Sequence, residues 1–179
     1  NPRSTHRYAV ITISGGTIIA SGTSNSAIDM SDVTMTGGTV SATGGYAVIA
    51  NGISNISGGT ITSTRNGSTF EVEGDGSLTV SGSAIIKNEY ATSNMGRAIG
   101  TGSGTINIEG GTVSSNGTTI RKTGSGNVNI SGGNISTTGD ASAAVELTHS
   151  SGRLNISGGS IEAPAAPATA AAVKHSGAN

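Results

Sequence analysis

The stretch ITISGGTI, residues Ile11–Ile18, decides the fold because close variants of it recur along the whole chain. Each copy has an apolar residue (Ser54 in the third copy), a Thr or Asn, a second apolar residue, and then SGGTI or a similar run. The later copies are VTMTGGTV from Val33, SNISGGTI from Ser54, LTVSGSAI from Leu78, INIEGGTV from Ile106, VNISGGNI from Val128 and LNISGGSI from Leu154. Self-similarity of this kind is typical of repeat proteins.

The spacing of the copies matches one coil of a parallel β-helix. Between the first glycines of successive corners the chain advances 22, 21, 24, 28, 22 and 26 residues. Helical-hairpin repeats are longer, and they would not carry 30 glycines in 179 residues. The sequence therefore predicts an all-β, single-stranded parallel β-helix (β-solenoid) of about seven coils of 21–28 residues. Residues 1–10 are expected to form an N-terminal arm and residues 11–179 the β-helix domain.

Apolar and polar residues alternate within each copy, which predicts the side chains that face inward. The residues two positions before and three positions after the first glycine are aliphatic or Met in every copy. Because the residue between the two apolar positions is Thr or Asn, we expect an outer ladder of these side chains. The predicted inward residues are Ile13, Met35, Ile56, Val80, Ile108, Ile130 and Ile156, then Ile18, Val40, Ile61, Ile85, Val113, Ile135 and Ile161.

A less regular half follows each copy and usually ends in a glycine six residues before the next glycine pair. We interpret each coil as three short strands joined by two constant corners and one variable loop. Insertions at 87–96 and 163–169 lengthen two of the loops. Insertions in solenoids normally collect on one face, which is often the binding face.

Composition excludes several function classes. The formal net charge is −1 and the charged residues are spread thinly, so a nucleic-acid-binding stripe is not expected. The chain has no cysteine, which excludes a disulfide scaffold and a thiolate metal site. It has no apolar run of membrane-spanning length, so membrane insertion is not expected. High Gly, Ser, Thr and Asn together with the repeats favour an extracellular or cell-surface location.

The two ends suggest self-association. The chain opens at Asn1 without Met, and its last unit stops where the next LNISGG-like strand should begin. Two interpretations remain open: the chain is a piece of a longer solenoid, or copies stack head to tail as in an open filament. In the filament, Ile11, Ile13 and Ile18 would pack on Val173 of another copy. The full set of expected self-assembly residues is Arg3, Arg7, Ile11, Ile13, Ile18, Val173 and Asn179.

No pattern of catalytic residues is apparent. The acidic residues occur mostly one per coil, whereas glycoside hydrolysis needs two facing carboxylates. In FEVEGDG, Phe70–Gly76, the carboxylates of Glu71, Glu73 and Asp75 could form only a weak cation site. Arg121 and Lys122 are adjacent and should point to opposite faces, one of them near the core. We expect no catalytic residue, no cofactor and no metal, and we expect His6, His149 and His175 to lie on the surface.

The repeated ISGGTI and GxLxISGG units resemble those of right-handed parallel β-helix proteins of the pectin-lyase-like type, in particular the repetitive surface and adhesin-like proteins of bacteria. The resemblance implies architecture and not an activity. Our first hypothesis is a non-enzymatic extracellular structural protein that stacks head to tail into a fibre or surface filament. The alternative is an adhesin or carbohydrate-binding segment that contacts surface polysaccharide through the loops 88–96 and 163–169. An enzyme that cleaves polysaccharide is disfavoured, as is ice binding, because Asn and Glu interrupt the outer Thr ladder.

Overall fold

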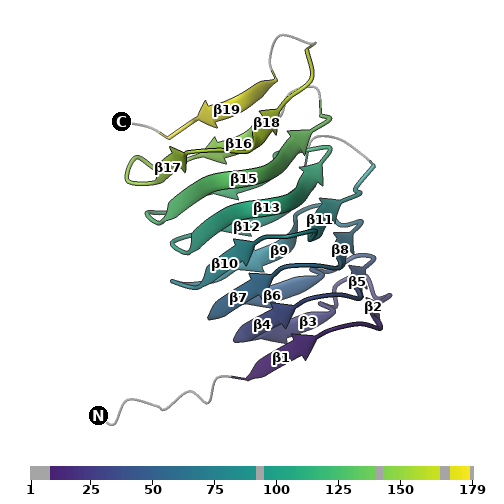
Figure 1. Ribbon diagram of the computed structural model, residues 1–179. Helices are drawn as coiled ribbons and strands as arrows, with labels where there is room; N and C mark the ends of the chain where they lie inside the picture. The colour runs from purple at the N-terminus through teal and green to yellow at the C-terminus, as the bar shows by residue number, and fades with distance from the viewer. Residues whose placement is uncertain (1–8, 92–94, 140–142, 166–169, 178–179) are drawn as a thin grey trace, which may run out of the picture.

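The computed structural model describes residues 9–91, 95–139, 143–165 and 170–177. These residues form an all-β structure in which the paired strands are parallel. The coils stack from the N-terminal end to the C-terminal end of an elongated rod (Figure 1). The chain makes about 6 turns. The predicted β-solenoid is therefore confirmed, and the predicted number of about seven coils is close.

Each coil contributes to two rows of strands in a 12-stranded sheet, sheet A, and to one row in a 7-stranded sheet, sheet B. The first row of sheet A contains β1 (Val10–Ile13), β4 (Asp32–Met35), β7 (Ile53–Ile56), β10 (Ser77–Val80), β13 (Thr105–Ser115), β15 (Asn127–Thr137) and β17 (Arg153–Ile156). The second row contains β2 (Thr17–Ala20), β5 (Thr39–Ala42), β8 (Thr60–Ser63), β11 (Ile85–Asn88), the distal parts of β13 and β15, and β18 (Ser160–Glu162). Sheet B contains β3 (Ile28–Met30), β6 (Val48–Ala50), β9 (Ser68–Val72), β12 (Arg97–Thr101), β14 (Ile120–Lys122), β16 (Ala143–Leu147) and β19 (Ala171–His175).

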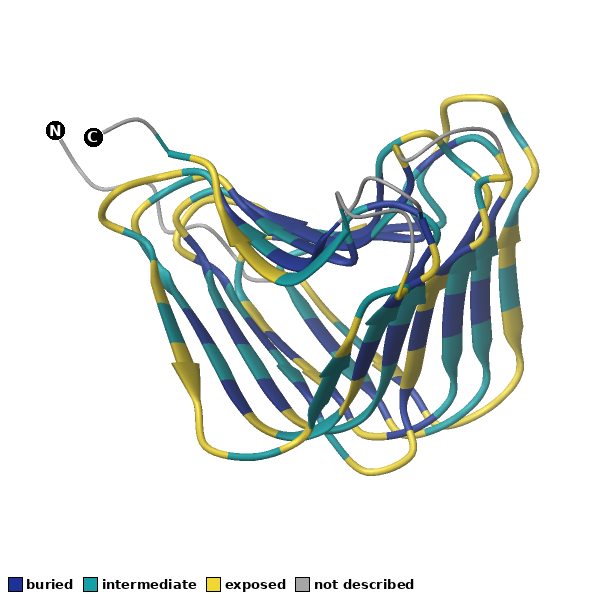
Figure 2. Ribbon diagram, turned by 90° about the horizontal axis from the view of Figure 1, so that it is seen from above, coloured by how far each residue is buried: buried dark blue, intermediate teal, exposed yellow. Residues whose placement is uncertain are grey.

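Viewed down the rod, the two rows of sheet A form two sides of each coil and sheet B closes the third (Figure 2). Buried positions alternate with exposed or intermediate ones along the strands of sheet A, as in β4 and β5. The apolar side chains meet between the three rows and form one continuous core. This arrangement follows from the period-two pattern of each repeat, because successive side chains of a strand point to opposite faces.

The SGG corner between the two rows of sheet A needs both of its glycines, for different reasons. A Cβ on Gly37 would lie 2.7 Å from the carbonyl oxygen of Ser14 in the preceding coil, so a side chain there would collide with backbone. Gly38 has a φ of 87°, a left-handed conformation that other residues rarely adopt. Close stacking of the coils therefore explains why the pair recurs.

Stacked side chains form columns that run along the rod. In sheet B the register places one apolar residue of every strand in the same column: Ile28, Val48, Phe70, Ile99, Ile120, Val145 and Val173. In sheet A the residues predicted to face inward are buried in the interior coils, for example Met35, Ile56 and Ile108, each 0% exposed. The alternation thus predicted most of the core correctly.

The prediction for the fourth copy is wrong by one residue. Ile86 is buried and pairs with Ile61, whereas Ile85 pairs with Thr60 and is 39% exposed. The corner of this copy, SGSA, contains one more residue between the two strands than SGG does. Because side chains alternate with a period of two, one extra residue moves the next strand by one position and exchanges its faces.

A buried polar column lies where the second row of sheet A ends. The side-chain Nδ2 of Asn88 lies 3.2 Å from Oγ of Ser63 and 3.0 Å from the carbonyl oxygen of Gly67, and its Oδ1 accepts the backbone N–H of Tyr90. One coil further, Oγ of Ser115 donates to the carbonyl oxygen of Gly117 at 2.9 Å. These groups satisfy the backbone of the tight turn into sheet B, which explains how polar residues are accommodated in the core.

Candidate functional site

Among the described residues, the three strands at the N-terminal end of the rod have a neighbour on one side only. In the strand pairings, β1 contacts β4, β2 contacts β5 and β3 contacts β6. Ile11 and Ile18 are only partly buried against the core, whereas Ile13 is 5% exposed. Val10 and Ile19 are 58% and 64% exposed. In the described part of the chain, this end thus presents apolar side chains on strands whose outer edges no other strand pairs with.

The C-terminal end presents the matching edges of the last coil. In the pairings, β17 and β18 contact β15, and β19 contacts β16. Ile156 and Val173 are 52% and 44% exposed, and Leu154 and Ile161 are partly buried against the core. Ile156 occupies an inward-facing column position next to Ile130, so its exposure arises because no described coil covers it.

The register changes the partner expected for Val173. Val173 lies in sheet B, in the column that begins with Ile28, and not in the columns of Ile11, Ile13 and Ile18. At the C-terminal end of the rod, those three columns end with Leu154, Ile156 and Ile161. The two ends therefore carry equivalent residues in equivalent rows. Arg3, Arg7 and Asn179, which were also expected to take part in assembly, lie outside the described residues.

The outward column of sheet B begins and ends with residues of opposite charge. Asp29 on β3 pairs in register with Ile49, and Lys174 on β19 pairs with Glu146. Asp29 is exposed, and the side chain of Lys174 is 48% exposed with its Nζ 3.8 Å from Oε1 of Glu146. A coil placed on the C-terminal end in continued register would bring an aspartate next to this lysine.

The acidic motif FEVEGDG does not gather its carboxylates at one point. Phe70 and Val72 are buried, and Glu71 lies on the outer face of sheet B. Burial raises the pKa of Glu71, and a hydrogen bond from Ser68 and the charge of Arg97 oppose this effect. Among the described residues, no group of three or more His, Asp or Glu side chains is placed to hold a metal ion.

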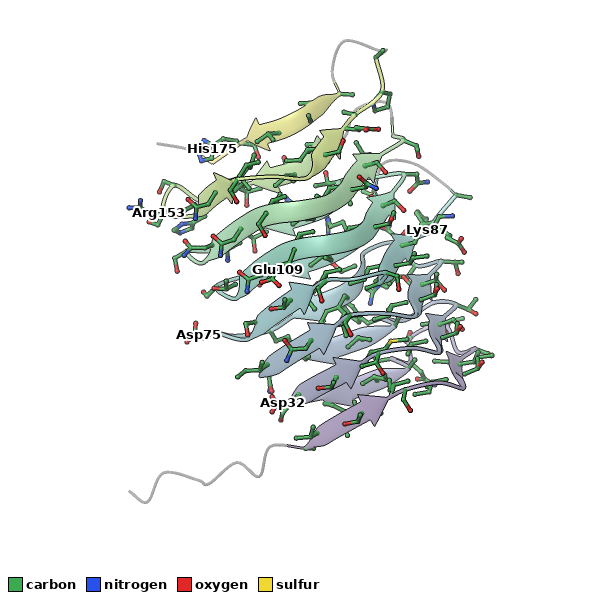
Figure 3. All side chains as sticks on the ribbon, in the orientation of Figure 1. Asp32, Asp75, Lys87, Glu109, Arg153 and His175 are labelled. Carbon is green, nitrogen blue, oxygen red and sulfur yellow. The ribbon has the colours of Figure 1, made fainter. Side chains whose placement is uncertain are left out.

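The remaining charged side chains are spread over the rod. Figure 3 shows Asp32 and Asp75 along one edge, at the turns into sheet A, and Lys87 on the opposite edge. Oδ1 of Asp32 accepts the backbone N–H of Ile53 at 2.8 Å, so this carboxylate ties two coils together. His149 and His175 are exposed, as predicted, and His6 lies outside the described residues.

Lys122 confirms the expectation that one residue of the Arg121–Lys122 pair faces the core. Its side chain is 0% exposed, and its Nζ donates to the carbonyl oxygen of Gly102 in the preceding coil. Burial lowers the pKa of Lys122. The sequence pattern predicted only that one of the two residues lies near the core, and the structure buries the whole side chain of Lys122, including its ammonium group.

The loops proposed as an alternative contact surface are described only in part, because residues 92–94 and 166–169 are outside the described ranges. Next to the first loop, Asn88, Asn116 and Thr138 line an open cavity beside the ion pair of Lys87 and Glu89. No aromatic side chain lines this cavity among the described residues, so it offers no stacking platform for a sugar ring.

No family model, no curated protein and no solved structure matches the chain. The chain is a parallel β-solenoid. In the described part of the chain, no helix is long and apolar enough to cross a membrane. The inference of function therefore depends on the geometry of the solenoid and on its two ends.

Proposed function

We propose that this chain is a non-enzymatic extracellular structural protein whose solenoids stack head to tail into a fibre or surface filament. The observation that carries the proposal is the match between the first and last coils of the described part of the chain. Ile11, Ile13 and Ile18 at one end have the same spacing in sequence as Leu154, Ile156 and Ile161 at the other. Both triplets flank an SGG corner, and the second glycines, Gly16 and Gly159, have nearly equal φ angles of 78° and 81°.

A second copy placed on the C-terminal end can continue every row of the rod. Its β1, β2 and β3 would lie on β17, β18 and β19, so that Leu154 contacts Ile11 and Val173 contacts Ile28. The strand edges would gain the backbone hydrogen bonds that interior coils have. Each large aliphatic side chain transferred from water to the core contributes about 1.5–3 kcal/mol. Several such side chains at each junction oppose an association cost of about 4–15 kcal/mol.

Charge complementarity favours this orientation over an end-to-end dimer of like ends. Continued register places Asp29 of the added copy beside Lys174, next to the existing contact between Lys174 and Glu146. A contact between two C-terminal ends would not bring Asp29 to Lys174, because Asp29 lies at the N-terminal end. The contact is therefore heterologous, and a heterologous contact that does not close produces an open filament.

We further infer that the solenoid is of the right-handed pectin-lyase-like type found in repetitive bacterial surface proteins. Coils of three parallel rows, a recurrent SGGTI corner and an aliphatic core support this assignment. A location outside the cell is consistent with the absence of cysteine and with the surface rich in Ser, Thr and Asn.

Negative-stain electron microscopy across a dilution series tests the proposal. The purified chain should form thin unbranched fibres, and Ile13→Lys should abolish them because a charge would enter the junction. Ile19→Lys is the matched control: it changes the same end, but Ile19 is 64% exposed and faces away from the core. Circular dichroism should show that both variants fold. Monomeric rods from the unmodified chain, or equal fibre loss in both variants, would refute the proposal.

A further inference from the structure

The strand register places a titratable residue in a core column at the C-terminal end of the rod. Sheet B has a second inward column, which contains Met30, Ala50, Val72, Thr101, Lys122, Leu147 and His175. The members from Ala50 to Leu147 are at most 6% exposed. His175 is exposed, because no described coil covers β19.

A second copy stacked on this end would bury the imidazole. In the head-to-tail stacking proposed above, on which this inference rests, β3 of an added copy lies on β19. Because Ile28 then continues the column of Val173, Met30 continues the column of His175. Met30 is partly buried against the core within its own chain. The imidazole would thus lie between Leu147 of one copy and Met30 of the next, and it would lose its contact with water.

A core column of this kind accepts a neutral imidazole more readily than a protonated one. Imidazole changes its charge between about pH 5 and pH 8, and burial disfavours the charged form of any group. Lys122 shows the effect in the same column, since burial lowers the pKa of its ammonium group. Nζ of Lys122 has the carbonyl oxygen of Gly102 as a partner, whereas the side chains on both sides of His175 would be apolar.

The charged groups on the neighbouring strands lie on the outer faces of the coil. Lys174 and Glu146 occupy adjacent outward positions of sheet B, and Glu162 on β18 is exposed on the outer face of sheet A. Oε1 of Glu146 accepts from Oγ of Ser176 at 2.8 Å and lies 3.8 Å from Nζ of Lys174. Among the described residues of these strands, no carboxylate faces the column to neutralise a cation at His175.

The adjacent turn and the added copy contribute further charges. Arg153 lies at the same edge of the rod as His175 (Figure 3), and His149 lies in the turn between β16 and β17. Both add positive charge to this end at low pH. In an added copy, Asp29 would lie on the outer face of sheet B, and Asp32 belongs to the next coil, where its Oδ1 accepts a backbone N–H at 2.8 Å. Burial therefore decides the sign of the effect.

We propose that His175 makes head-to-tail assembly sensitive to pH, because the junction forms around a neutral imidazole and is weakened when the imidazole is protonated. In the acidic range each new junction then releases one proton. By linkage, the association constant falls by up to about tenfold for each unit of pH in that range. The filament is thus stable at neutral pH and disassembles in mild acid.

Sedimentation of the purified chain between pH 5 and pH 8 measures the concentration of free protein in equilibrium with fibres. This critical concentration should rise by about tenfold or more as the pH falls through the range of imidazole titration. His175→Gln should remove most of the dependence, because an amide does not titrate. His175→Leu should lower the critical concentration at every pH, because leucine suits the column.

His149→Gln is the matched control, since His149 is exposed in a turn outside the column, and it should keep the pH dependence of the unmodified chain. Circular dichroism at each pH should show that all variants fold. A critical concentration that does not change with pH, a full dependence in His175→Gln, or an equal loss in His149→Gln would overturn the role of His175 and leave head-to-tail stacking intact. Absence of fibres at every pH would overturn both, so the two failures are distinguishable.

Discussion

Asn129 donates its side-chain N–H to the side-chain oxygen of Asn107 in the preceding coil, with 2.8 Å between Nδ2 and Oδ1. The same residue accepts from Nδ2 of Asn155 in the following coil at 2.7 Å. Asn107 continues the ladder to Oγ1 of Thr79 at 3.4 Å. The outer Thr and Asn positions of the fourth to seventh copies therefore join successive coils through their side chains.

Removal of the central amide should weaken the stacking of three coils. Asn129→Ala loses one donated and one accepted hydrogen bond, so we expect the free energy of unfolding to fall by about 1–2 kcal/mol. Thr34→Ala is the matched control at the equivalent position of the second copy, where no side-chain hydrogen bond joins the coils in the described structure, and it should change stability by less than about 0.5 kcal/mol. Urea denaturation measures both values. Equal effects of the two substitutions would show that the ladder contributes nothing specific.

The buried ammonium group of Lys122 should make stability depend on pH at alkaline values. Burial lowers its pKa in the folded state below the ordinary value of 10.5, so the unfolded chain binds more protons between the two pKa values. Stability should therefore rise with pH through that window. Lys122→Met should remove this rise and stabilise the fold at neutral pH by about 1–2 kcal/mol, because it removes the desolvation penalty.

Denaturant unfolding of both proteins between pH 7 and pH 11 measures the effect of Lys122. Lys87→Met is the control, because the side chain of Lys87 is 48% exposed and forms only a surface ion pair with Glu89. An unchanged pH profile in Lys122→Met, or a similar change in Lys87→Met, would contradict the assignment of the alkaline dependence to the buried ammonium group.

The SGSA corner gives a direct test of the register. Ile86→Asn should destabilise the fold strongly, by about 3 kcal/mol or more, since it buries an unpaired amide. Ile85→Asn should be tolerated, because the side chain of Ile85 is 39% exposed on the outer face. Thermal unfolding of the two variants distinguishes them. If Ile85→Asn destabilised the fold more than Ile86→Asn, the register predicted from the repeat pattern alone would be correct.

The same corner shows what sequence reasoning can and cannot predict. Spacing and alternation predict the solenoid, the inward columns and the Thr and Asn ladder, because a strand imposes a period of two. They fail at Ile85, because the repeat pattern does not show that the SGSA corner contains one residue more than the SGG corners. They also assign Asn88 to an inserted loop, whereas its amide closes the buried polar column.

The sequence also predicted only some of the residues of the candidate assembly surface. The apolar residues of the first and last strands are visible in the repeats, and among the described residues Ile156 and Val173 are exposed, whereas Ile13 is 5% exposed. Which residues share a column depends on the lengths of the variable loops. The strand register of the structure was therefore needed to place Ile28 and Val173 in the same column of sheet B. That Gly100 and Arg121 are neighbours in the outward column of sheet B could not be predicted either, because they belong to two different coils.

Disulfide trapping of the junction tests head-to-tail stacking most directly. Thr12 and Asn155 occupy the same outer column at opposite ends of the rod, about 6 turns apart, so cysteines placed there cannot pair within one chain. In a stacked pair they would lie on adjacent strands about 4.8 Å apart, which a disulfide can span. The chain has no other cysteine to compete. The matched control is Thr12→Cys with Glu162→Cys, which places one cysteine in a different row of the same end.

Mild oxidation followed by non-reducing electrophoresis provides the readout. Thr12→Cys with Asn155→Cys should form a ladder of dimers, trimers and longer chains that reducing agent collapses, and the control pair should remain largely monomeric. Monomers from both proteins, or equal ladders from both, would contradict head-to-tail stacking in continued register.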